Sequence, residues 1–299
     1  MKLRKVLIVY KKSTYQIQAV EHREARFLKL IEEGHATVTR VKTAHDEHYE
    51  TLELLQTELF RRNIEFRSVA RVDLNATVED VDLVISLGGD GTFLDASHFV
   101  ERVPLLGINS SRSSSFGHFC LANEGNLSSV LDEIESGAQT PCRLLRLELS
   151  LNGSPLPELV LNEVLVCHSN PAGTSRYFME LRGIKEEHRS SGVWVGPPAG
   201  STGALKAAGG LVLPITARQY QYLVREPGPR PGDRWQNLKA ILDASDEMRI
   251  VSQMRTGALY IDGQHIDYGF ALGDELTIRA SQNDLIAYVS PAINDIFRE

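Results

Sequence analysis

The sequence predicts a two-domain protein: an α/β N-terminal domain with a parallel, Rossmann-like sheet, and an all-β C-terminal domain, a β-sandwich or a related two-layer sheet. In the first half of the chain, short apolar runs of strand composition alternate with amphipathic helical segments, which is typical of a parallel sheet covered on both faces. Near Thr140-Pro141 the pattern changes to alternating apolar and polar residues, which indicates half-buried antiparallel strands. The expected domains are residues 1–138 and 139–286.

The first half opens with a buried strand at 6–10. A helical segment follows, with apolar residues at helical spacing between Val20 and Ile31 and an end near Gly34. A second amphipathic helix is predicted over about 46–62. The remaining elements of this half are strands at 64–69, 81–87 and 104–109, a helix after Gly91, and a helix between Asn126 and Gly137, since Asn suits a helix start and Gly a helix end.

The second half is predicted to consist mainly of strands. Alternating segments lie at 145–151, 177–182, 258–261 and 275–279, and an apolar strand-like run covers 159–166. Asn152-Gly153 is typical of a hairpin turn. The stretch 225–234 holds three prolines and two glycines, which indicates a loop that serves as a surface connection, a lid or an oligomer contact.

Composition limits the class of function. The formal net charge of −7 argues against a general nucleic-acid binder, because affinity for a phosphate backbone needs a clustered basic surface. Three cysteines, odd in number and far apart in sequence, favour reduced core residues over disulfides or a metal site. The sequence has neither a cleavable leader pattern nor a run of ~20 apolar residues, so we expect no membrane segment and a cytoplasmic location.

The stretch from Val84 to Leu94 carries the strongest functional signal. A strand ends in Gly88-Gly89-Asp90-Gly91-Thr92 and a helix-compatible segment follows. Such a turn presents unobstructed backbone N–H groups at the positive end of a helix, which suits phosphate. A carboxylate repels phosphate, so Asp90 indicates a metal ligand or a proton acceptor. Taken alone, the motif is equally typical of a tight turn with Asp90 as helix N-cap.

Four later motifs accompany this loop in a fixed order: Gly107-Ile-Asn109, Asn162-Glu163, Gly200-Ser-Thr202 with Gly209-Gly210, and Asp262-Gly-Gln264. With them, the chain resembles the NAD kinase family over most of its length. The resemblance implies an active site between an α/β and an all-β domain, and a C-terminal segment, about 287–299, that returns to the first domain. It also implies transfer of the γ-phosphoryl group of ATP to the adenosine-ribose 2′-hydroxyl of NAD, giving NADP.

The resemblance assigns roles to individual residues. Asp90 would be the catalytic base. The residues that would bind ATP and its phosphates are Gly88, Gly89, Gly91, Thr92, Ser201 and Thr202. Those that would bind NAD are Asp90, Gly91, Asn109, Phe116, Asn162, Glu163, Arg189, Ser191, Thr202, Gly203 and Gln264. No protein metal site is expected, because Mg²⁺ is usually held by phosphates and few carboxylates and would arrive with ATP. The family also implies a homo-oligomer, at least a dimer.

The sequence departs from the common family pattern at two places. Ser190-Ser191 precedes Gly192 where most members carry an Asp, and Gly203-Ala204 follows the Gly-Ser-Thr motif where they usually continue Ala-Tyr. In both respects the chain is similar to the divergent mitochondrial-type NAD kinases. Arg189 fits equally a contact with a substrate phosphate and a pair with Glu186 or Glu187.

Two other functions remain open from the sequence. A lipid or other small-alcohol kinase shares the Gly-Gly-Asp-Gly loop, and a catalytically silent NAD-binding regulator would explain the altered residues after Thr202. The sequence also leaves open NAD or NADH as acceptor, and ATP or polyphosphate as donor.

Overall fold

The computed structural model describes residues 2–229, 231–232 and 234–297, and the chain forms two compact units. Unit 1 comprises Met1–Cys142 with Leu285–Ser290, and unit 2 comprises Arg143–Asp284 with Pro291–Glu299. Arg230 and Asp233 of the proline-rich stretch lie outside the described residues. Among the described residues, no helix is both long enough and apolar enough to cross a membrane.

Unit 1 confirms the predicted α/β class. Its sheet has the order β2-β1-β3-β4-β19-β6, with β5 beside β4. The pairs that β1 forms with β2 and β3, and that β4 forms with β3, β5 and β19, are all parallel. The strands are β1 Lys5–Tyr10, β2 Glu65–Ala70, β3 Leu83–Gly88, β4 Leu105–Asn109, β5 Cys120–Asn123, β6 Cys142–Leu144 and β19 Leu285–Tyr288.

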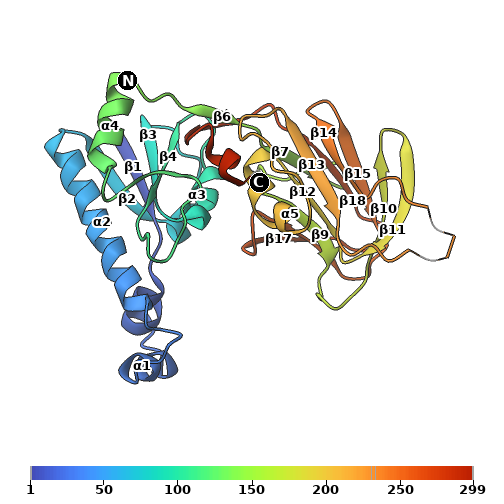
Figure 1. Ribbon diagram of the computed structural model, residues 1–299, viewed down its shortest axis with the longest axis horizontal. Coiled ribbons are helices and arrows are strands. Elements are labelled where there is room, and N and C mark those ends of the chain that lie inside the picture. Colours follow the sequence, from blue (N-terminus) through green and yellow to red (C-terminus); the bar gives the residue numbers. More distant parts are fainter. Residues whose placement is uncertain (1, 230, 233, 298–299) are drawn as a thin grey trace. The chain divides into compact units, whose positions relative to one another are not determined.

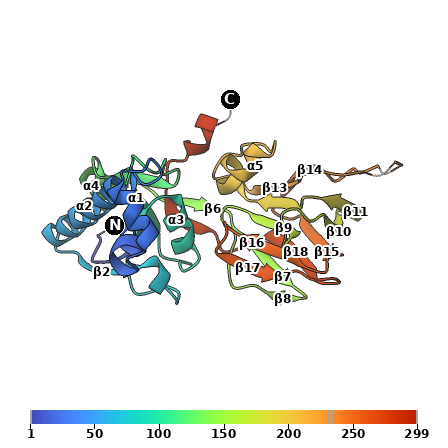
Figure 2. The same ribbon diagram turned by 90° about the horizontal axis from the view of Figure 1, so that it is seen from below.

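Helices cover both faces of this sheet (Figure 1, Figure 2). The helices are α2 Val41–Arg61, α3 Asp90–Ser97 and α4 Leu127–Ser136. On one face, Leu55 of α2 and Leu131 of α4 are buried in one cluster with Ile85 of β3. α3 covers the other face, where a Cβ on Gly107 would lie 3.1 Å from the ring of Phe93. A parallel sheet with helices on both faces opens for ligands at the carboxyl ends of its strands.

The helical segment before Gly34 differs from the prediction. It forms a π-helical turn, η1 (Gln16–Glu21), and a separate helix, α1 (Ala25–Glu32). The break falls at Arg23, whose φ of +50° is incompatible with a right-handed helix, and the Glu24 carboxylate then accepts the Phe27 N–H at 2.9 Å to start α1. α2 begins at Val41, earlier than predicted, because no proline or glycine interrupts residues 41–46.

Unit 2 confirms the all-β prediction. It holds two six-stranded antiparallel sheets, ordered β11-β10-β15-β18-β7-β8 and β14-β13-β12-β9-β16-β17. The strands are β7 Leu147–Leu151, β8 Ser154–Pro155, β9 Val164–His168, β10 Ser175–Leu181, β11 Ile184–Ser190, β12 Val193–Gly196, β13 Gln219–Val224, β14 Lys239–Asp243, β15 Glu247–Ser252, β16 Gly257–Ile261, β17 Ile266–Gly269 and β18 Glu275–Ala280. Both sheets contribute to one buried cluster, which is the core of a sandwich.

Local sequence signals explain the hairpin between β7 and β8 but not the start of β9. Asn152 and Gly153 have φ of +53° and +78°, as a two-residue hairpin turn requires. The apolar run 159–166 predicted that Asn162 and Glu163 lie within a strand. In the structure β9 begins only at Val164, so both residues precede it. They lie in the bend before it, because their N–H groups bind a carboxylate rather than a neighbouring strand.

The last residues of the chain also differ in place from the prediction. The segment that joins the sheet of unit 1 is Leu285–Ser290, whereas residues from Pro291 onward belong to unit 2. There the Asn294 amide, in the short helix η4 (Ile293–Phe297), donates to the carbonyls of Pro198 at 3.0 Å and Leu213 at 2.8 Å. These hydrogen bonds attach η4 to backbone carbonyls of the second unit.

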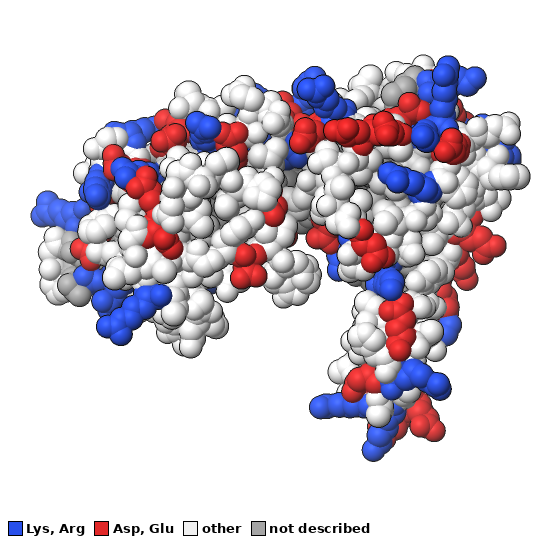
Figure 3. All heavy atoms as spheres, turned by 180° about the vertical axis from the view of Figure 1, so that it is seen from behind, with Lys and Arg blue, Asp and Glu red and all other residues white. Residues whose placement is uncertain are grey.

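Charged side chains of both signs occur on the face of the molecule drawn in Figure 3. On the face drawn in Figure 3, Lys and Arg are scattered among Asp and Glu and do not merge into a basic patch. This distribution agrees with the net charge of −7 and gives that face no footprint for a nucleic-acid backbone.

Candidate active site

The Gly88–Thr92 loop joins β3 to α3 at the carboxyl end of the parallel sheet. Gly89 is the N-cap of α3, with φ −124° and ψ −163°. A Cβ on Gly88 would lie 2.2 Å from Thr92 Oγ1, and one on Gly89 would lie 2.4 Å from Ser115 Oγ. A side chain at either position would therefore displace the side chain of Thr92 or Ser115, and glycine leaves the backbone of the helix start without a side chain of its own.

The carboxylate of Asp90 is oriented by a backbone amide. The Phe119 N–H donates to Asp90 Oδ1 at 2.8 Å, and the Phe119 ring stacks on Phe93 of α3 with centroids 5.1 Å apart. Because α3 and the loop before β5 are locked together by this ring pair, the position of the carboxylate is set by packing as well as by the hydrogen bond.

Asn109, at the end of β4, holds the loop that follows it. Its Nδ2 donates to the carbonyls of Ser115 at 2.9 Å and Phe116 at 3.3 Å, and its Oδ1 accepts the Ser111 N–H at 3.2 Å. The side chain of Phe116 is 68% exposed at the end of this loop. The structure thus gives Asn109 an internal positioning role and leaves the Phe116 ring open to a ligand.

Two cations near the Gly88–Thr92 loop were missed by sequence reasoning. Arg71 Nη1 lies 3.9 Å from the place a Cβ on Gly91 would take, and it pairs with Asp95 at 2.6 Å. Burial, and then the charge of Arg71, lower the pKa of Lys11. Lys11 directly follows β1 and Arg71 directly follows β2, so their places after predicted strands could have indicated them.

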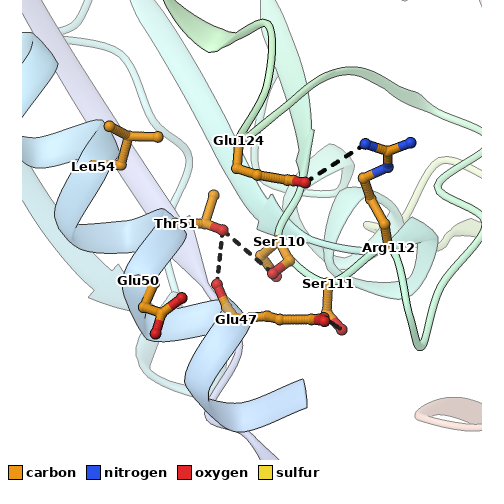
Figure 4. A pocket seen from close by; sticks show the side chains of 8 residues that line it. All are labelled: Glu47, Glu50, Thr51, Leu54, Ser110, Ser111, Arg112 and Glu124. Carbon is orange, nitrogen blue, oxygen red and sulfur yellow. Dashed lines mark hydrogen bonds and ion pairs between the residues drawn. The ribbon is translucent and has the colours of Figure 1, made fainter. Parts of the chain in front are cut away.

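A separate hollow of about 480 Å³ in unit 1 has the wrong chemistry for phosphate. In Figure 4 the side chains of Glu47, Thr51 and Leu54 project from α2 toward Ser110–Arg112 and Glu124. Ser111 donates to Glu47 at 2.6 Å, Thr51 donates to the Ser110 carbonyl at 3.4 Å, and Arg112 pairs with Glu124 at 3.6 Å. Its carboxylates outnumber its cations, so we assign it no part in binding anions.

In unit 2, Asp262 holds the bend that carries Asn162 and Glu163. Its carboxylate accepts three consecutive backbone N–H groups, from Leu161 at 3.0 Å, Asn162 at 2.7 Å and Glu163 at 3.1 Å. On the other side, a Cβ on Gly200 would lie only 1.7 Å from the Asn162 carbonyl oxygen. The bend is thus fixed between a carboxylate and a glycine turn far along the chain.

The surroundings of Glu163 make its protonation easier than in water. The residue is 6% exposed. Asn162 Nδ2 donates to its Oε2 at 2.5 Å, which favours the ionised form, but burial outweighs this contact. Burial and the charge of Asp262 raise the pKa of Glu163 to about 7. Burial also raises the pKa of Asp262, but three amide donors favour its ionised form, so we assign the proton of this pair to Glu163.

The Gly-Ser-Thr motif forms a short helical turn, η3 (Pro198–Thr202), followed by α5 (Ala204–Ala207). Ser201 is fully buried: its hydroxyl donates to the Pro198 carbonyl at 2.7 Å and accepts the Leu213 N–H at 3.0 Å. Ser201 therefore supports the turn from inside, whereas Thr202 is partly exposed and Gly203 is exposed.

The other predicted contacts of unit 2 lie on β11, beyond it, and in a hairpin turn. Arg189 stands directly opposite Arg176 on β10 and pairs with Glu187 at 3.7 Å. Arg176, Arg189 and Ser191 are among the residues that line a hollow of about 380 Å³. The Ser191 N–H donates to the Arg225 carbonyl at 3.0 Å. Gln264 is exposed in the turn between β16 and β17.

No group of three or more His, Cys, Asp or Glu that could hold a metal ion occurs in the part of the chain that the structure describes. The three cysteines, Cys120, Cys142 and Cys167, are free thiols.

Comparisons with known proteins give one consistent likeness. The family model of the ATP-NAD kinase N-terminal domain matches residues 6–138. A probable NADH kinase of Oryza sativa subsp. japonica is 39% identical over 254 residues, which cover 77% of this chain and 78% of the relative. An NADH kinase of Arabidopsis thaliana is 33% identical over 281 residues, covering 83% and 86% of the two chains.

Solved structures share the fold across nearly the whole chain. An NAD kinase from Archaeoglobus fulgidus in complex with ATP superposes with a TM-score of 0.68 at 20% identity, covering 98% of this chain and 96% of that one. Yeast NADH kinase complexed with NADH gives a TM-score of 0.67 at 19% identity, covering 96% and 84%.

Proposed function

This chain belongs to the NAD kinase family, and we propose that it transfers the γ-phosphoryl group of ATP to the adenosine-ribose 2′-hydroxyl of NAD or NADH. The observation that carries this proposal is the Gly88–Thr92 loop, where an oriented Asp90 carboxylate stands at a helix start with bare backbone. Phosphoryl transfer asks a protein mainly for positioning and charge stabilisation, and this loop supplies both.

We assign the base to Asp90 because its carboxylate is held by the Phe119 amide, so little reorganisation is needed before it accepts the proton of a ribose hydroxyl. Gly88, Gly89 and Gly91 would present backbone N–H groups to the phosphates of ATP. Thr92, whose N–H donates to the Gly89 carbonyl at 3.0 Å, would contribute by holding this turn.

Lys11 and Arg71 would supply the positive charge that a triphosphate needs, since both follow strands of the same parallel sheet, Arg71 lies near Gly91, and Lys11 feels the charge of Arg71. Mg²⁺, when bound, would neutralise part of the phosphate charge, and its ligands would be mainly the phosphates of ATP.

For the dinucleotide we propose Asn162 and Glu163 as the central contacts, because Asp262 and Gly200 fix their backbone. A protonated Glu163 would both donate and accept hydrogen bonds to ribose hydroxyls or the adenine side. The further dinucleotide contacts that we propose are Phe116, Arg189, Ser191, Thr202, Gly203 and Gln264, while Asn109 and Ser201 act as positioning residues.

We also propose that the protein acts as at least a dimer, as its family resemblance implies, in a reducing compartment such as the cytoplasm. Three free thiols are compatible with a reducing compartment.

The direct test measures NADP and NADPH formation from NAD or NADH, each with ATP or polyphosphate as donor. We expect turnover with ATP and at least one dinucleotide. Phosphorylation of a lipid alcohol with no dinucleotide turnover would favour the lipid kinase. Thermal stabilisation by dinucleotide with no phosphoryl transfer from any donor would favour the silent regulator.

A further inference from the structure

The outer face of the β12-β9-β16 sheet carries a row of two aromatic side chains and a leucine that the sequence motifs did not include. Trp194 of β12 stands opposite Leu165 of β9, which stands opposite Tyr260 of β16. Their strand neighbours, such as Val195 and Val166, point into the sandwich core, so this row faces away from it. All three side chains are half-buried. With strands about 4.8 Å apart, the row forms an apolar floor roughly 10 Å wide, the breadth of a nucleobase.

This floor lies in a hollow of about 450 Å³ that reaches the proposed dinucleotide contacts. Its lining consists of Glu163, Leu165, Trp194, Tyr260, Gly263 and Gln264. The carboxyl of Glu163 and the amide of Gln264 give the hollow a polar edge beside its apolar floor. Aromatic floors with a few polar edge groups are typical sites for planar bases that carry an amino or amide group.

Arg225, whose Nε lies 3.9 Å from Glu226 Oε2, brings a guanidinium group beside the floor. Its guanidinium carbon lies 5.4 Å from the centroid of the Trp194 ring, and its Nη1 donates to the Ser191 carbonyl at 3.3 Å. Arg225 also lines an adjoining hollow of about 300 Å³ that shares Leu165 and Tyr260 with the first. Because the indole already interacts with one cation, a second cation stacked on it would be repelled.

We propose that Trp194, Leu165 and Tyr260 form a stacking slot for a neutral planar base of the acceptor dinucleotide, and that Arg225 disfavours a cationic ring there. This inference rests on the proposed function for the identity of the ligand. The base is the adenine or the dihydronicotinamide ring, which share a neutral ring face and an exocyclic NH₂ group, an amine on adenine and an amide on dihydronicotinamide, whereas the oxidised nicotinamide ring is cationic. The slot thus gives a physical basis for choosing between NADH and NAD.

The binding test uses tryptophan fluorescence. The chain has two tryptophans, Trp194 and Trp235, so a Trp235→Phe protein reports on Trp194 alone. AMP, reduced nicotinamide mononucleotide and oxidised nicotinamide mononucleotide are titrated separately. Quenching by AMP assigns the slot to adenine, and quenching by the reduced mononucleotide assigns it to dihydronicotinamide. If Trp235→Phe does not fold, calorimetry with the wild-type chain and its Trp194→Leu variant replaces the titration. No response to any of the three probes overturns the slot.

The kinetic test measures KM for the dinucleotide acceptor and KM for the ATP donor separately. Trp194→Leu should raise KM for the dinucleotide by about tenfold, since stacking of a base contributes on the order of 1–3 kcal/mol, and leave KM for ATP within about twofold. Phe178→Leu is the matched control, because Phe178 on β10 also lies under a cation, Lys185 at 5.0 Å, on the other sheet. A change in KM for ATP alone, or an equal effect of Phe178→Leu, would overturn the proposal.

A separate variant tests whether the charge of Arg225 disfavours a cationic ring in the slot. Arg225→Gln should improve binding of the oxidised mononucleotide relative to the neutral probes by about threefold. Equal affinity of the wild-type protein for oxidised and neutral probes would remove Arg225 from the proposal. A wild-type protein that forms no NADP or NADPH would contradict the proposed function, while quenching of Trp194 would still measure the slot by itself.

Discussion

Two neighbouring carboxyl groups in unit 2 have different hydrogen-bond surroundings. Asp262 accepts hydrogen bonds from three backbone N–H groups, and these bonds stabilise its ionised form. Glu163 has 6% exposure and faces the charge of Asp262, and these two effects raise its pKa against the opposing hydrogen bond from Asn162. One residue thus holds backbone in place, and the other is available as a donor near neutral pH.

The first residue-scale prediction concerns the base. Asp90→Asn should lower kcat by about 10²- to 10⁴-fold, because an amide cannot accept the hydroxyl proton, although its oxygen can still accept the Phe119 N–H. NADP formation measures the effect. Asp80→Asn, at an exposed position before β3, is the control and should leave kcat unchanged. An Asp90→Asn enzyme with full turnover would exclude Asp90 as the base.

The second residue-scale prediction concerns how the stability of the protein depends on pH. The pKa of Glu163 rises from 4.5 to about 7 on folding, so between these values the folded protein binds a proton that the unfolded chain has released. Its contribution to stability therefore falls as pH rises through this window and is lost above it. Glu163→Gln does not titrate and should be more stable than wild type above pH 7, by about 3 kcal/mol.

Urea unfolding at pH 5 and pH 8 measures this effect. Glu247→Gln, at an exposed position of β15, provides the control and should follow the wild-type pH dependence. If Glu163→Gln also follows it, the carboxyl is ionised in the folded protein across the whole range.

At the scale of elements, glycine turns and carboxylates fix the segments that carry the site. The turn η3 passes so close to the bend before β9 that Gly200 leaves no space for a side chain, with 1.7 Å from an added Cβ to the Asn162 carbonyl. The bend is therefore formed by contact between two elements, and neither element could set it alone.

Gly200→Ala should consequently destabilise the protein by about 3 kcal/mol and raise KM for the dinucleotide, since Asn162 must move. Gly269→Ala is the matched control, because a Cβ on Gly269 of β17 meets nothing within 4 Å. Thermal unfolding and steady-state kinetics measure both variants. Equal stability of the two variants would show that the bend can relax without cost.

At the scale of the molecule, the chain passes between the two units at residues 142–143, 284–285 and 290–291. β19 pairs with β4 inside the sheet of unit 1, and its side chains, such as Leu285 and Ala287, are buried. Neither unit is therefore a continuous piece of sequence, and each depends on residues near the C-terminus.

Two truncations test this dependence. A chain that ends at Ser290 keeps β19 but loses Asn294, so hydrogen exchange should accelerate around Pro198–Leu213 while the sheet of unit 1 stays protected. A chain that ends at Asp284 should also lose protection in β4. Full protection of β4 in the shorter chain would mean that β19 is dispensable to the sheet.

Much of the fold was predictable because its causes are local. The parallel strands of unit 1, the hairpin at Asn152-Gly153 and the end of α4 at Gly137, with φ +81°, follow from period, composition and turn residues within a short window. The break at Arg23 and the short strand β5 were missed, because neither has a periodic apolar pattern to mark it.

The sequence by itself determined the two fold classes, the Gly88–Thr92 loop and the order of motifs that resembles the NAD kinase family, since each is written in neighbouring residues. Only the tertiary structure decided which side chains meet. Asp262 binds the N–H of Asn162 across 100 positions of sequence, and Trp194 stands beside Leu165 and Tyr260 on one sheet face. Such contacts depend on strand order and register, which long-range packing sets and no local pattern encodes.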